Sequence, residues 1–431
     1  MELEKKVDTG VKIISAVLWA VVLIGLAQFI FQIYHVNTLG KSQLGPKIDQ
    51  MSEPDGGQDL PLRENNSEII KIWKNRYTPE QKPVYNLSEL DNESFDIFLV
   101  GGSSTVHPPG KKEKFSYFVE KNLNSSIERE VKVYNFGKAG LTTKTLVSYV
   151  RGLKNITEPD LILLYSGHND FIFPHRRVLR RKSKVFLGRN ILHYFLKGTS
   201  VFLSEKKYDK ITSHLTPDLL YRLRNIGLIG ENLDRNIRYT NRKVLENYRK
   251  NTEKIIEIGK EENIPVMFST VISNLEIKPK GLPPTTEDER FYRYKEKGTE
   301  LYKEKNYDKS LTQLKKANKI YNQSAEVHYY LGKIYREINE TERSFEHLIK
   351  AKDLDNFYYD VRVKSSLNDY LRQINRTGVY TVDLEKELMD RNVRMGDEYF
   401  SDLLHPNIKM NRKIGSIMAD YIEERMEKFE G

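Results

Sequence analysis

The chain has 431 residues, of which 39% are hydrophobic and 11% aromatic, so it can form more than one folded unit and global disorder is excluded. It has no cysteine, which excludes disulfides, thiolate zinc sites and a cysteine nucleophile. Lys and Arg outnumber Asp and Glu by 70 to 60. This excess either serves solubility or attracts anionic envelope polymers and lipid headgroups, and no motif predicts nucleic-acid binding.

An apolar segment follows the N-terminal tail of residues 1–12. Ile13–Tyr34 contains 22 residues without a charge, and as a helix it would span about 33 Å, enough to cross a bilayer core. The apolar region of a cleaved signal peptide is shorter and precedes a small-residue cleavage site, whereas this run ends in Gln-Ile-Tyr-His. We therefore predict an uncleaved transmembrane signal anchor at residues 13–34.

Charges on either side of this segment indicate its orientation. Three lysines precede it and two follow closely, a bias that favours an inside N-terminus. The protein is then a single-pass membrane protein whose bulk faces the periplasmic or cell-surface side. Residues 35–68, which include "SEPDGGQDLPLRENNS", are polar and rich in turn formers, and we predict that they form a tether.

A serine follows the first predicted strand of the folded region. Phe95–Val100 is a short apolar run typical of a buried strand, Gly101-Gly102 end it, and Ser103 comes next, before a helix near Lys114–Asn124. Open α/β sheets bind their ligands at this end of a strand. The same turn could hold a phosphate on its backbone N–H groups, or be a plain strand–helix turn.

Two further predicted strands are followed by residues that could take part in catalysis. "VKVYNFGKAGLTT" predicts a strand at Val131–Asn135, with Gly140 in the loop behind it. "PDLILLYSGHND" predicts a strand at Leu161–Tyr165, with Asn169 just beyond it. The carboxyl ends of parallel strands meet at one edge of a sheet, so we expect Gly140 and Asn169 to lie near Ser103.

These three residues could form an oxyanion hole. Acyl transfer needs hydrogen-bond donors aimed at the developing oxyanion, and the backbone N–H groups of Ser103 and Gly140 with the Asn169 amide would supply three. The alternative is that Gly140 is an ordinary turn glycine and Asn169 a strand-capping amide.

The C-terminal part of the sequence completes the fold. Strands are predicted at Ile264–Val271 and Val379–Leu384, and helices near Val244–Glu262 and at Lys409–Phe429. The fold class is therefore α/β, a three-layer sandwich with about five parallel strands.

An aspartate and a histidine lie close together before the last predicted helix. In "SDLLHPN", Asp402 precedes His405 by three residues. Such pairs are usually solvated surface groups, but a carboxylate that orients an imidazole is also half of a nucleophilic triad.

The order of these motifs resembles the SGNH hydrolases, also called the GDSL esterase family, over roughly residues 93–274 and 359–428. The resemblance implies a flavodoxin-like fold. The resemblance departs at Gly102, where the name-giving motif has aspartate; a Gly-Gly-Ser version is familiar in bacterial membrane-linked members, and the difference bears on substrate preference more than on catalysis. Four blocks match in order: Gly101-Gly102-Ser103, Gly140, Gly167-His168-Asn169-Asp170 and Asp402-Leu403-Leu404-His405.

The resemblance implies a role for each matching residue. Ser103 would attack the acyl carbonyl, His405 would remove its proton, and Asp402 would hold the imidazole. It also implies a hydrolase domain in two parts, residues 69–290 and 359–431. No cofactor is implied, and no His/carboxylate cluster has the spacing of a metal site. His168 either touches substrate or forms a local hydrogen bond.

A basic insertion, residues 171–238, interrupts the first part of the hydrolase domain. Within it, "HRRVLRRKSKVFLGR" at residues 175–189 holds seven Lys or Arg in its last fourteen positions. It is either a solvated helix face or a basic lid or rim that attracts an anionic glycan or phospholipid surface.

A second insertion, residues 291–358, contains an internal repeat of 34 residues. Small residues at fixed points allow two helices to cross closely, and the spacing is that of two tetratricopeptide repeats, which would form four helices. They are either a helical spacer or a groove for a partner protein or an extended polymer. The repeat pairs Gly298 with Gly332, Leu301 with Tyr335, Ser310 with Ser344, Leu314 with Leu348, and Ala317 with Ala351.

Together these features predict a membrane-anchored serine esterase that removes an acyl group, acetyl in the first instance, from an envelope carbohydrate or lipid. The same residues could transfer acetyl to a sugar, which would make the protein an O-acetyltransferase on an envelope glycan. An alternative of another class is a tetratricopeptide scaffold with a residual hydrolase core. The five intact site residues argue against that alternative.

Overall fold

The computed structural model describes residues 62–63, 69–71, 84–86, 93–154, 158–175, 231–279, 284, 286–356 and 361–430. The predicted anchor at residues 13–34 and residues 176–230 of the basic insertion lie outside this part. None of the helices in the described part is long and apolar enough to cross a membrane. Apart from the first ten residues of α8, the features below belong to one compact unit, residues 52–174 with 241–431.

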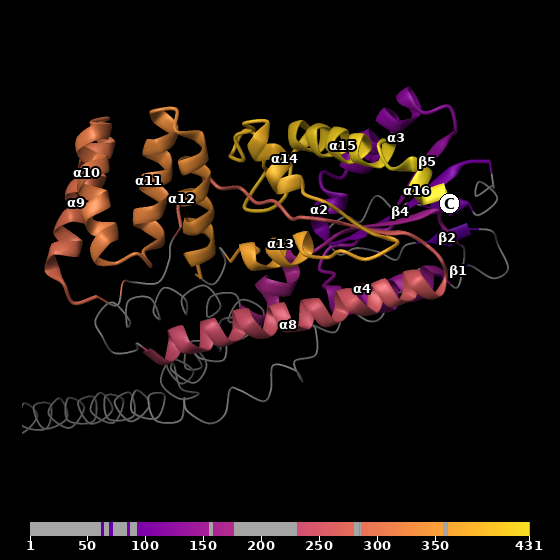
Figure 1. Cartoon of the computed structure of the whole chain (residues 1–431), viewed down its shortest axis with the longest axis horizontal. Coiled ribbons are helices and arrows are strands. Elements are labelled where there is room, and N and C mark those ends of the chain that lie inside the picture. Colours follow the sequence, from indigo (N-terminus) through magenta and orange to yellow (C-terminus); the bar gives the residue numbers. More distant parts are fainter. Residues whose placement is uncertain are drawn as a thin grey trace, which may run out of the picture. The chain divides into compact units, whose positions relative to one another are not determined.

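A five-stranded parallel sheet forms the centre of this unit (Figure 1). Its strand order is β5-β4-β6-β7-β8, so β4, the first of these five strands in the chain, lies second from the edge, as in flavodoxin-like folds. All seven residues of β4 are buried, as expected for a central strand covered on both faces. The strands are β4 (Phe95–Gly101), β5 (Val131–Asn135), β6 (Leu161–Tyr165), β7 (Val266–Ser269) and β8 (Val379–Val382).

Helices cover both faces of the sheet. Figure 1 shows α3 and α15 on one side of the strands and α4 with α8 on the other, so the three-layer α/β arrangement predicted from the sequence is confirmed. Their apolar faces and the strands form one continuous core. The helices of this part are α2 (Ser103–Val106), α3 (Phe115–Ser126), α4 (Thr143–Lys154), α8 (Glu231–Glu261), α13 (Ser365–Arg372), α14 (Leu384–Asp390), α15 (Ile408–Glu423) and α16 (Met426–Glu430), with a 3-10 turn η2 (Lys111–Glu113).

The predicted boundaries of several elements differ from the structure. Strand β7 spans Val266–Ser269 rather than Ile264–Val271, and β8 ends at Val382 rather than Leu384. Helix α8 begins at Glu231 rather than near Val244. The sequence pattern missed this first part of the helix because residues 231–243 carry few apolar side chains and show little hydrophobic periodicity. The single helix predicted at Lys409–Phe429 is divided into α15 and α16, since α15 ends at Glu423.

A small antiparallel sheet precedes the main sheet in the chain. It contains β1 (Leu62–Arg63), β2 (Ile69–Lys71) and β3 (Val84–Asn86) in that order. Strand β1 lies within residues 35–68, which the sequence predicts as a tether. Strands of two or three residues are too short to leave a pattern of alternating side chains, so sequence periodicity does not find them.

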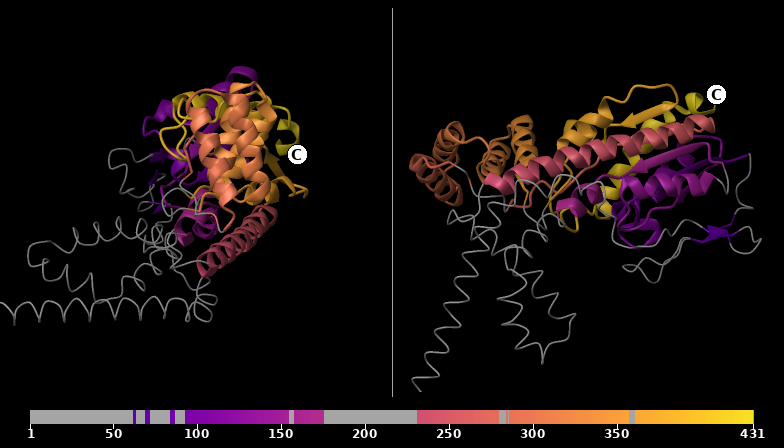
Figure 2. Two further views of the ribbon diagram at one scale, coloured as in Figure 1. Left: turned by 90° about the vertical axis from the view of Figure 1, so that its left-hand side faces the viewer. Right: turned by 90° about the horizontal axis from the view of Figure 1, so that it is seen from below.

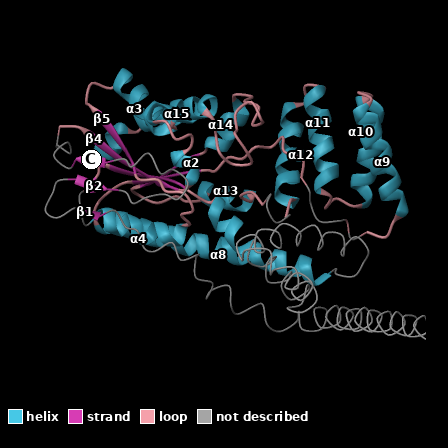
Figure 3. Ribbon diagram, turned by 180° about the vertical axis from the view of Figure 1, so that it is seen from behind, coloured by secondary structure: helices cyan, strands magenta, loops and turns pink. Residues whose placement is uncertain are grey.

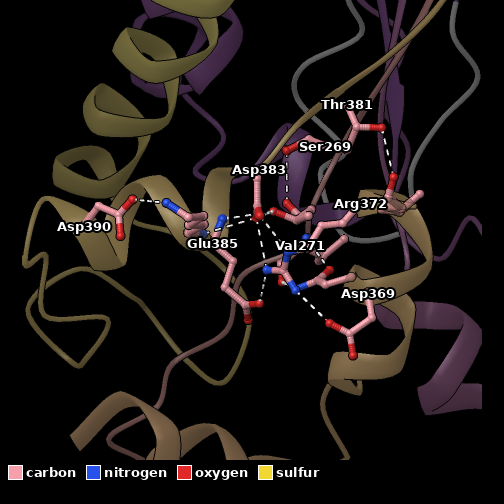
Figure 4. A network of polar contacts seen from close by, with 12 residues as sticks. Ser269, Val271, Asp369, Arg372, Thr381, Asp383, Glu385 and Asp390 are labelled. Carbon is pink, nitrogen blue, oxygen red and sulfur yellow. Dashed lines mark hydrogen bonds and ion pairs between the residues drawn. The ribbon is translucent and has the colours of Figure 1, made fainter. Parts of the chain in front are cut away.

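A polar network fixes the chain where it leaves the last strand (Figure 4). The guanidinium of Arg372, the last residue of α13, donates to Asp383 at 2.6 Å, Glu385 at 2.8 Å and Asp369 at 2.9 Å. The Asp383 side chain also caps α14 by accepting from the backbone N–H of Lys386. One arginine thus ties the end of β8 and the start of α14 to α13.

The second insertion consists of four helices that stand side by side as two hairpins (Figure 2), and it contains no strand in the part of the chain that the structure describes (Figure 3). They are α9 (Glu289–Lys303), α10 (Tyr307–Ile320), α11 (Ala325–Glu337) and α12 (Thr341–Leu354).

Equivalent contacts recur in the two hairpins at the predicted spacing of 34 residues. The hydroxyl of Ser310 donates to the carbonyl of Gly298 at 2.6 Å, and that of Ser344 donates to the carbonyl of Gly332 at 2.8 Å. The two hairpins therefore pack alike at these positions, while their assignment to the tetratricopeptide class stays a prediction.

Candidate active site

The candidate nucleophile lies in a tight turn at the carboxyl end of β4. Ser103 is the first residue of α2, directly after β4 and Gly102. A Cβ at Gly101 would collide with the Tyr165 carbonyl of the neighbouring strand, so the turn needs glycine there. The Thr105 hydroxyl closes the turn by donating to the Gly102 carbonyl at 2.7 Å. Strand packing and turn together place Ser103 at the edge of the sheet.

Ser103, His405 and Asp402 form one hydrogen-bonded chain. The Nε2 atom of His405 is 2.8 Å from Ser103 Oγ, and its Nδ1 is 2.6 Å from Asp402 Oδ2. An ionised carboxylate only accepts hydrogen bonds, so Nδ1 carries the hydrogen and Nε2 is left to accept the serine hydroxyl. This is the arrangement of a nucleophile, a general base and a group that orients the base.

The second oxygen of Asp402 is held by the backbone of its own loop. Asp402 Oδ1 accepts the N–H groups of Leu404 at 2.9 Å and His405 at 2.8 Å. Partial burial alone would raise the pKa of Asp402, but the hydrogen bonds from the His405 ring and these backbone groups outweigh it and hold the pKa at about 2. Asp402 therefore stays ionised beside His405 at neutral pH.

The Asp402–His405 loop ends at a capped helix. The Asn407 side chain accepts from the backbone N–H groups of Lys409 and Met410 and so caps α15. Its amide also donates to the Glu398 carbonyl at 2.7 Å. Because both ends of the loop are held, His405 is positioned by a fixed backbone.

The predicted oxyanion residues come together beside Gly102. The Asn169 amide donates to the Leu141 carbonyl at 2.8 Å, and a Cβ at Gly102 would lie 3.1 Å from the same amide nitrogen. Gly140 has a positive φ of 85°, which favours glycine. An amide nitrogen carries two hydrogens, and the bond to Leu141 uses one of them. The Asn169 side chain thus links the turn before Ser103 to the loop after β5.

Asp170, the neighbour of Asn169, has a structural role. Its buried carboxylate accepts from the backbone N–H of Thr143 at 3.1 Å and from the Thr143 hydroxyl. It therefore caps α4 and anchors the end of β6 against the start of that helix.

His168 is buried next to the site. Neither ring nitrogen makes a hydrogen bond of ordinary geometry in the described part of the chain, although the Ile272 backbone lies near enough to the ring to favour its protonated form weakly. Burial, with a further contribution from His405, lowers the pKa of His168 to about 3. The ring is therefore neutral at physiological pH and is not a proton carrier.

Sequence reasoning missed a third histidine at the site. The ring centroids of His107 and His405 are 4.9 Å apart, and His107 Nε2 is 3.3 Å from Ser401 Oγ. Burial and then the proximity of His405 lower the pKa of His107. The sequence does contain one signal for His107, its spacing from Ser103. A residue four positions after Ser103 lies on the same side of a helical turn.

Among the residues with described positions, no group of three or more His, Asp or Glu side chains could hold a metal ion.

No family model matches the chain, and no curated protein matches it. Solved structures are similar to it at low sequence identity. A lipase from a goat rumen metagenome is 13% identical with a TM-score of 0.33, and covers 76% of this chain and 97% of its own. An acetyl xylan esterase is 12% identical with a TM-score of 0.31, and the match spans 76% of this chain and 99% of the esterase. A lipase/acylhydrolase from Enterococcus faecalis is 16% identical with a TM-score of 0.28, and the match spans 77% of this chain and 96% of that protein.

Likeness at this level concerns the fold and does not carry an activity from one protein to another. The chemistry of this chain therefore has to be derived from its own side chains.

Proposed function

We propose that this chain is a serine ester hydrolase of the SGNH type that works through an acyl-enzyme. The observation that carries the proposal is the hydrogen-bonded chain from Ser103 through His405 to Asp402, with spacings of 2.8 and 2.6 Å. Two of these residues lie about 300 positions from the third, so the fold has brought a complete nucleophile–base–carboxylate set together at the end of β4.

Acylation begins at Ser103. Its Oγ attacks the ester carbonyl as His405 Nε2 accepts the hydroxyl proton, and Asp402 stabilises the resulting imidazolium. When the tetrahedral intermediate collapses, the bond to the alcohol oxygen breaks and His405 returns the proton to that oxygen. A water molecule then attacks the acyl-enzyme by the same route, which releases the acid and restores Ser103.

The oxyanion would be stabilised by the residues around Gly102. The second N–H of the Asn169 amide is available for this purpose, and the loop bearing Gly140 is fixed beside it by the bond to Leu141. Fixed donors stabilise the developing negative charge without reorganising during the reaction, which is the usual source of the largest rate gain.

The substrate and the membrane location are also proposals. We propose an acetyl ester on an envelope carbohydrate or lipid as the substrate, and a single-pass anchor at residues 13–34 that keeps the enzyme at the membrane. Support comes from the 22 uncharged residues of that segment and from the basic run at residues 175–189, which suits an anionic surface.

Removal of the nucleophile tests the chemistry. The full-length chain in mild detergent would be assayed for p-nitrophenyl acetate hydrolysis and for labelling by a fluorophosphonate probe. Ser103→Ala should lose at least about 10³-fold in kcat and all labelling. Ser125→Ala is the matched control, because the exposed Ser125 hydroxyl donates to the Lys121 carbonyl within its own helix α3 and to no residue of the site. If the two variants lose activity equally, Ser103 is not the nucleophile.

The anchor is tested separately by alkaline carbonate extraction of membranes. The wild-type chain should stay in the pellet, while a variant with Val22→Lys and Leu26→Lys should be released, because charges at a helix centre oppose insertion. Release of the wild-type chain would exclude the anchor and leave the esterase proposal intact.

A further inference from the structure

A short segment after β7 lies between the catalytic loop and the helical insertion. Residues Asn274–Glu276, called the bridging segment here, hydrogen-bond through their backbone to the loop that carries Asp402 and His405 and to the chain just before it. The Asn274 N–H donates to the Leu403 carbonyl at 3.0 Å, and the Leu275 N–H donates to the Met395 carbonyl at 2.8 Å. The bridging segment thus forms the backbone support of the Asp402–His405 loop.

The Asn274 side chain adds a second support. Its amide nitrogen lies 3.3 Å from the Asp402 carbonyl and donates to the Asp397 carboxylate at 2.7 Å, while its oxygen accepts the Glu276 N–H at 2.9 Å. Asn274 is 1% exposed. A buried amide that uses both its donor and acceptor groups holds one orientation, because any other would leave a buried polar group unpaired.

The same segment is tied to the end of the helical insertion. Arg362 donates to the Asn274 carbonyl at 2.6 Å and to Asp355, just after α12, at 3.1 Å. The side chains of Arg362 and Asp355 are 1% and 0% exposed. A buried ion pair of this kind resists separation, since a lone buried charge is strongly destabilising.

Glu276 makes a second link to the insertion. Its carboxylate pairs with Arg336 of α11 and with Arg394 of the catalytic-loop region, and its carbonyl accepts the Tyr329 hydroxyl at 3.0 Å. Glu276 is therefore shared between the insertion and the catalytic loop.

We propose that Asn274 is a positioning residue for the Asp402–His405 loop, and that Glu276 ties the alignment of His405 to the helical insertion. This proposal rests on the proposed esterase function and deepens it, because it assigns the insertion a role in regulating the same site. A ligand or partner that shifts α11 or α12 would move the bridging segment, and with it the loop that orients the catalytic base.

The test measures both the rate constant and the stoichiometry of fluorophosphonate labelling at Ser103 in the full-length chain. Asn274→Ala and Glu276→Gln should keep one label per chain but react about 10- to 100-fold more slowly, with kcat for p-nitrophenyl acetate lowered and KM little changed. A merely structural role would instead reduce the number of labelled chains and leave the rate constant of the remaining ones unchanged.

Glu326→Gln is the matched control for Glu276→Gln. Glu326 on α11 also pairs with two cations, Lys278 and Lys295, and neither of them lies in the Asp402–His405 loop. It should label at the wild-type rate. Wild-type rates in both test variants, or equal slowing in the control, would overturn the proposal, whereas a wild-type chain that takes no label would overturn the esterase function itself.

Discussion

The hydroxyl of Ser104 donates to the backbone carbonyl of Leu404, 300 residues further along the chain, at 3.1 Å. This bond joins the turn that carries the candidate nucleophile to the loop that carries its base. Both residues are buried, so the bond is shielded from competing water. The distance between Ser103 and His405 is therefore fixed by the residues next to them as well as by their own hydrogen bond.

The first prediction concerns the orientation of His405. Asp402→Asn would replace an acceptor with an amide that can donate, so the imidazole would lose the tautomer in which Nε2 accepts the serine hydroxyl. We expect kcat for p-nitrophenyl acetate to fall about 10⁴-fold with a small change in KM. Asp420→Asn, on the exposed side of α15, is the control. A loss below ten-fold in Asp402→Asn would show that this carboxylate does not orient the base.

The second prediction concerns the oxyanion. Asn169→Ala should lower kcat about 10²- to 10³-fold, because one fixed donor is lost from the transition state. Asn124→Ala is a matched control, since the Asn124 amide likewise donates to a backbone carbonyl, that of Val131, at 2.7 Å. Steady-state kinetics would measure kcat and KM for both variants and show whether the loss is specific to Asn169. Equal effects would mean that Asn169 only supports the Leu141 loop.

The third prediction concerns pH and stability. His168 has a pKa of about 3 in the folded chain and an ordinary value near 6.5 when unfolded. Below about pH 6.5 the unfolded chain binds a proton that the folded chain does not, so stability is present above that pH and is lost on acidification towards pH 3. His168→Gln should lose about 2 kcal/mol less stability than the wild type between pH 7 and pH 5.

Urea unfolding at both pH values measures this difference. The difference in free energy of unfolding between wild type and His168→Gln should stay constant between pH 7 and pH 9, where the ring is neutral in both the folded and the unfolded chain. If the two free energies fall in parallel below pH 7, His168 is protonated in the folded chain.

The fourth prediction concerns the helical insertion. A Cβ at Gly332 would lie 2.6 Å from Leu348 Cγ, and one at Gly298 would meet Leu314 Cγ at the same distance. Gly332→Ala and Gly298→Ala should each destabilise the chain by about 1–3 kcal/mol, although alanine favours a helix. Thermal unfolding measures this.

A double variant separates the clash from other causes. Gly332→Ala with Leu348→Ala should be less destabilised than the sum of the two single variants, because the smaller side chain makes room for the new methyl group. Additive effects would mean that the helices do not cross as closely as the structure places them.

The strands of the main sheet could be predicted because their signals are local. Each is a short apolar run, and the residues after it are glycines or polar groups that end a strand. The bounds of β5 and β6 agree with the prediction to the residue. Because parallel strands end at one edge, the positions of Ser103 and Asn169 relative to the sheet also followed from the sequence.

Other parts of the site could not be predicted in this way. His107 and Asn274 are ordinary residues in sequence, and their position beside the catalytic loop depends on how distant segments pack. The same holds for Glu276, whose partners lie 60 and 118 residues away. Local spacing carries no information about such contacts.

By itself, then, the sequence determined the kinds of element in this protein, the order of its strands along the chain, and the residue types able to perform acyl transfer. These depend on hydrophobic periodicity, turn chemistry and motif spacing, which act over a few residues. The tertiary structure alone decided the hydrogen bond between His405 and Ser103, the burial of His168, and the link from the insertion to the catalytic loop. Those depend on packing between segments up to 300 residues apart, where burial sets the strength of each polar contact.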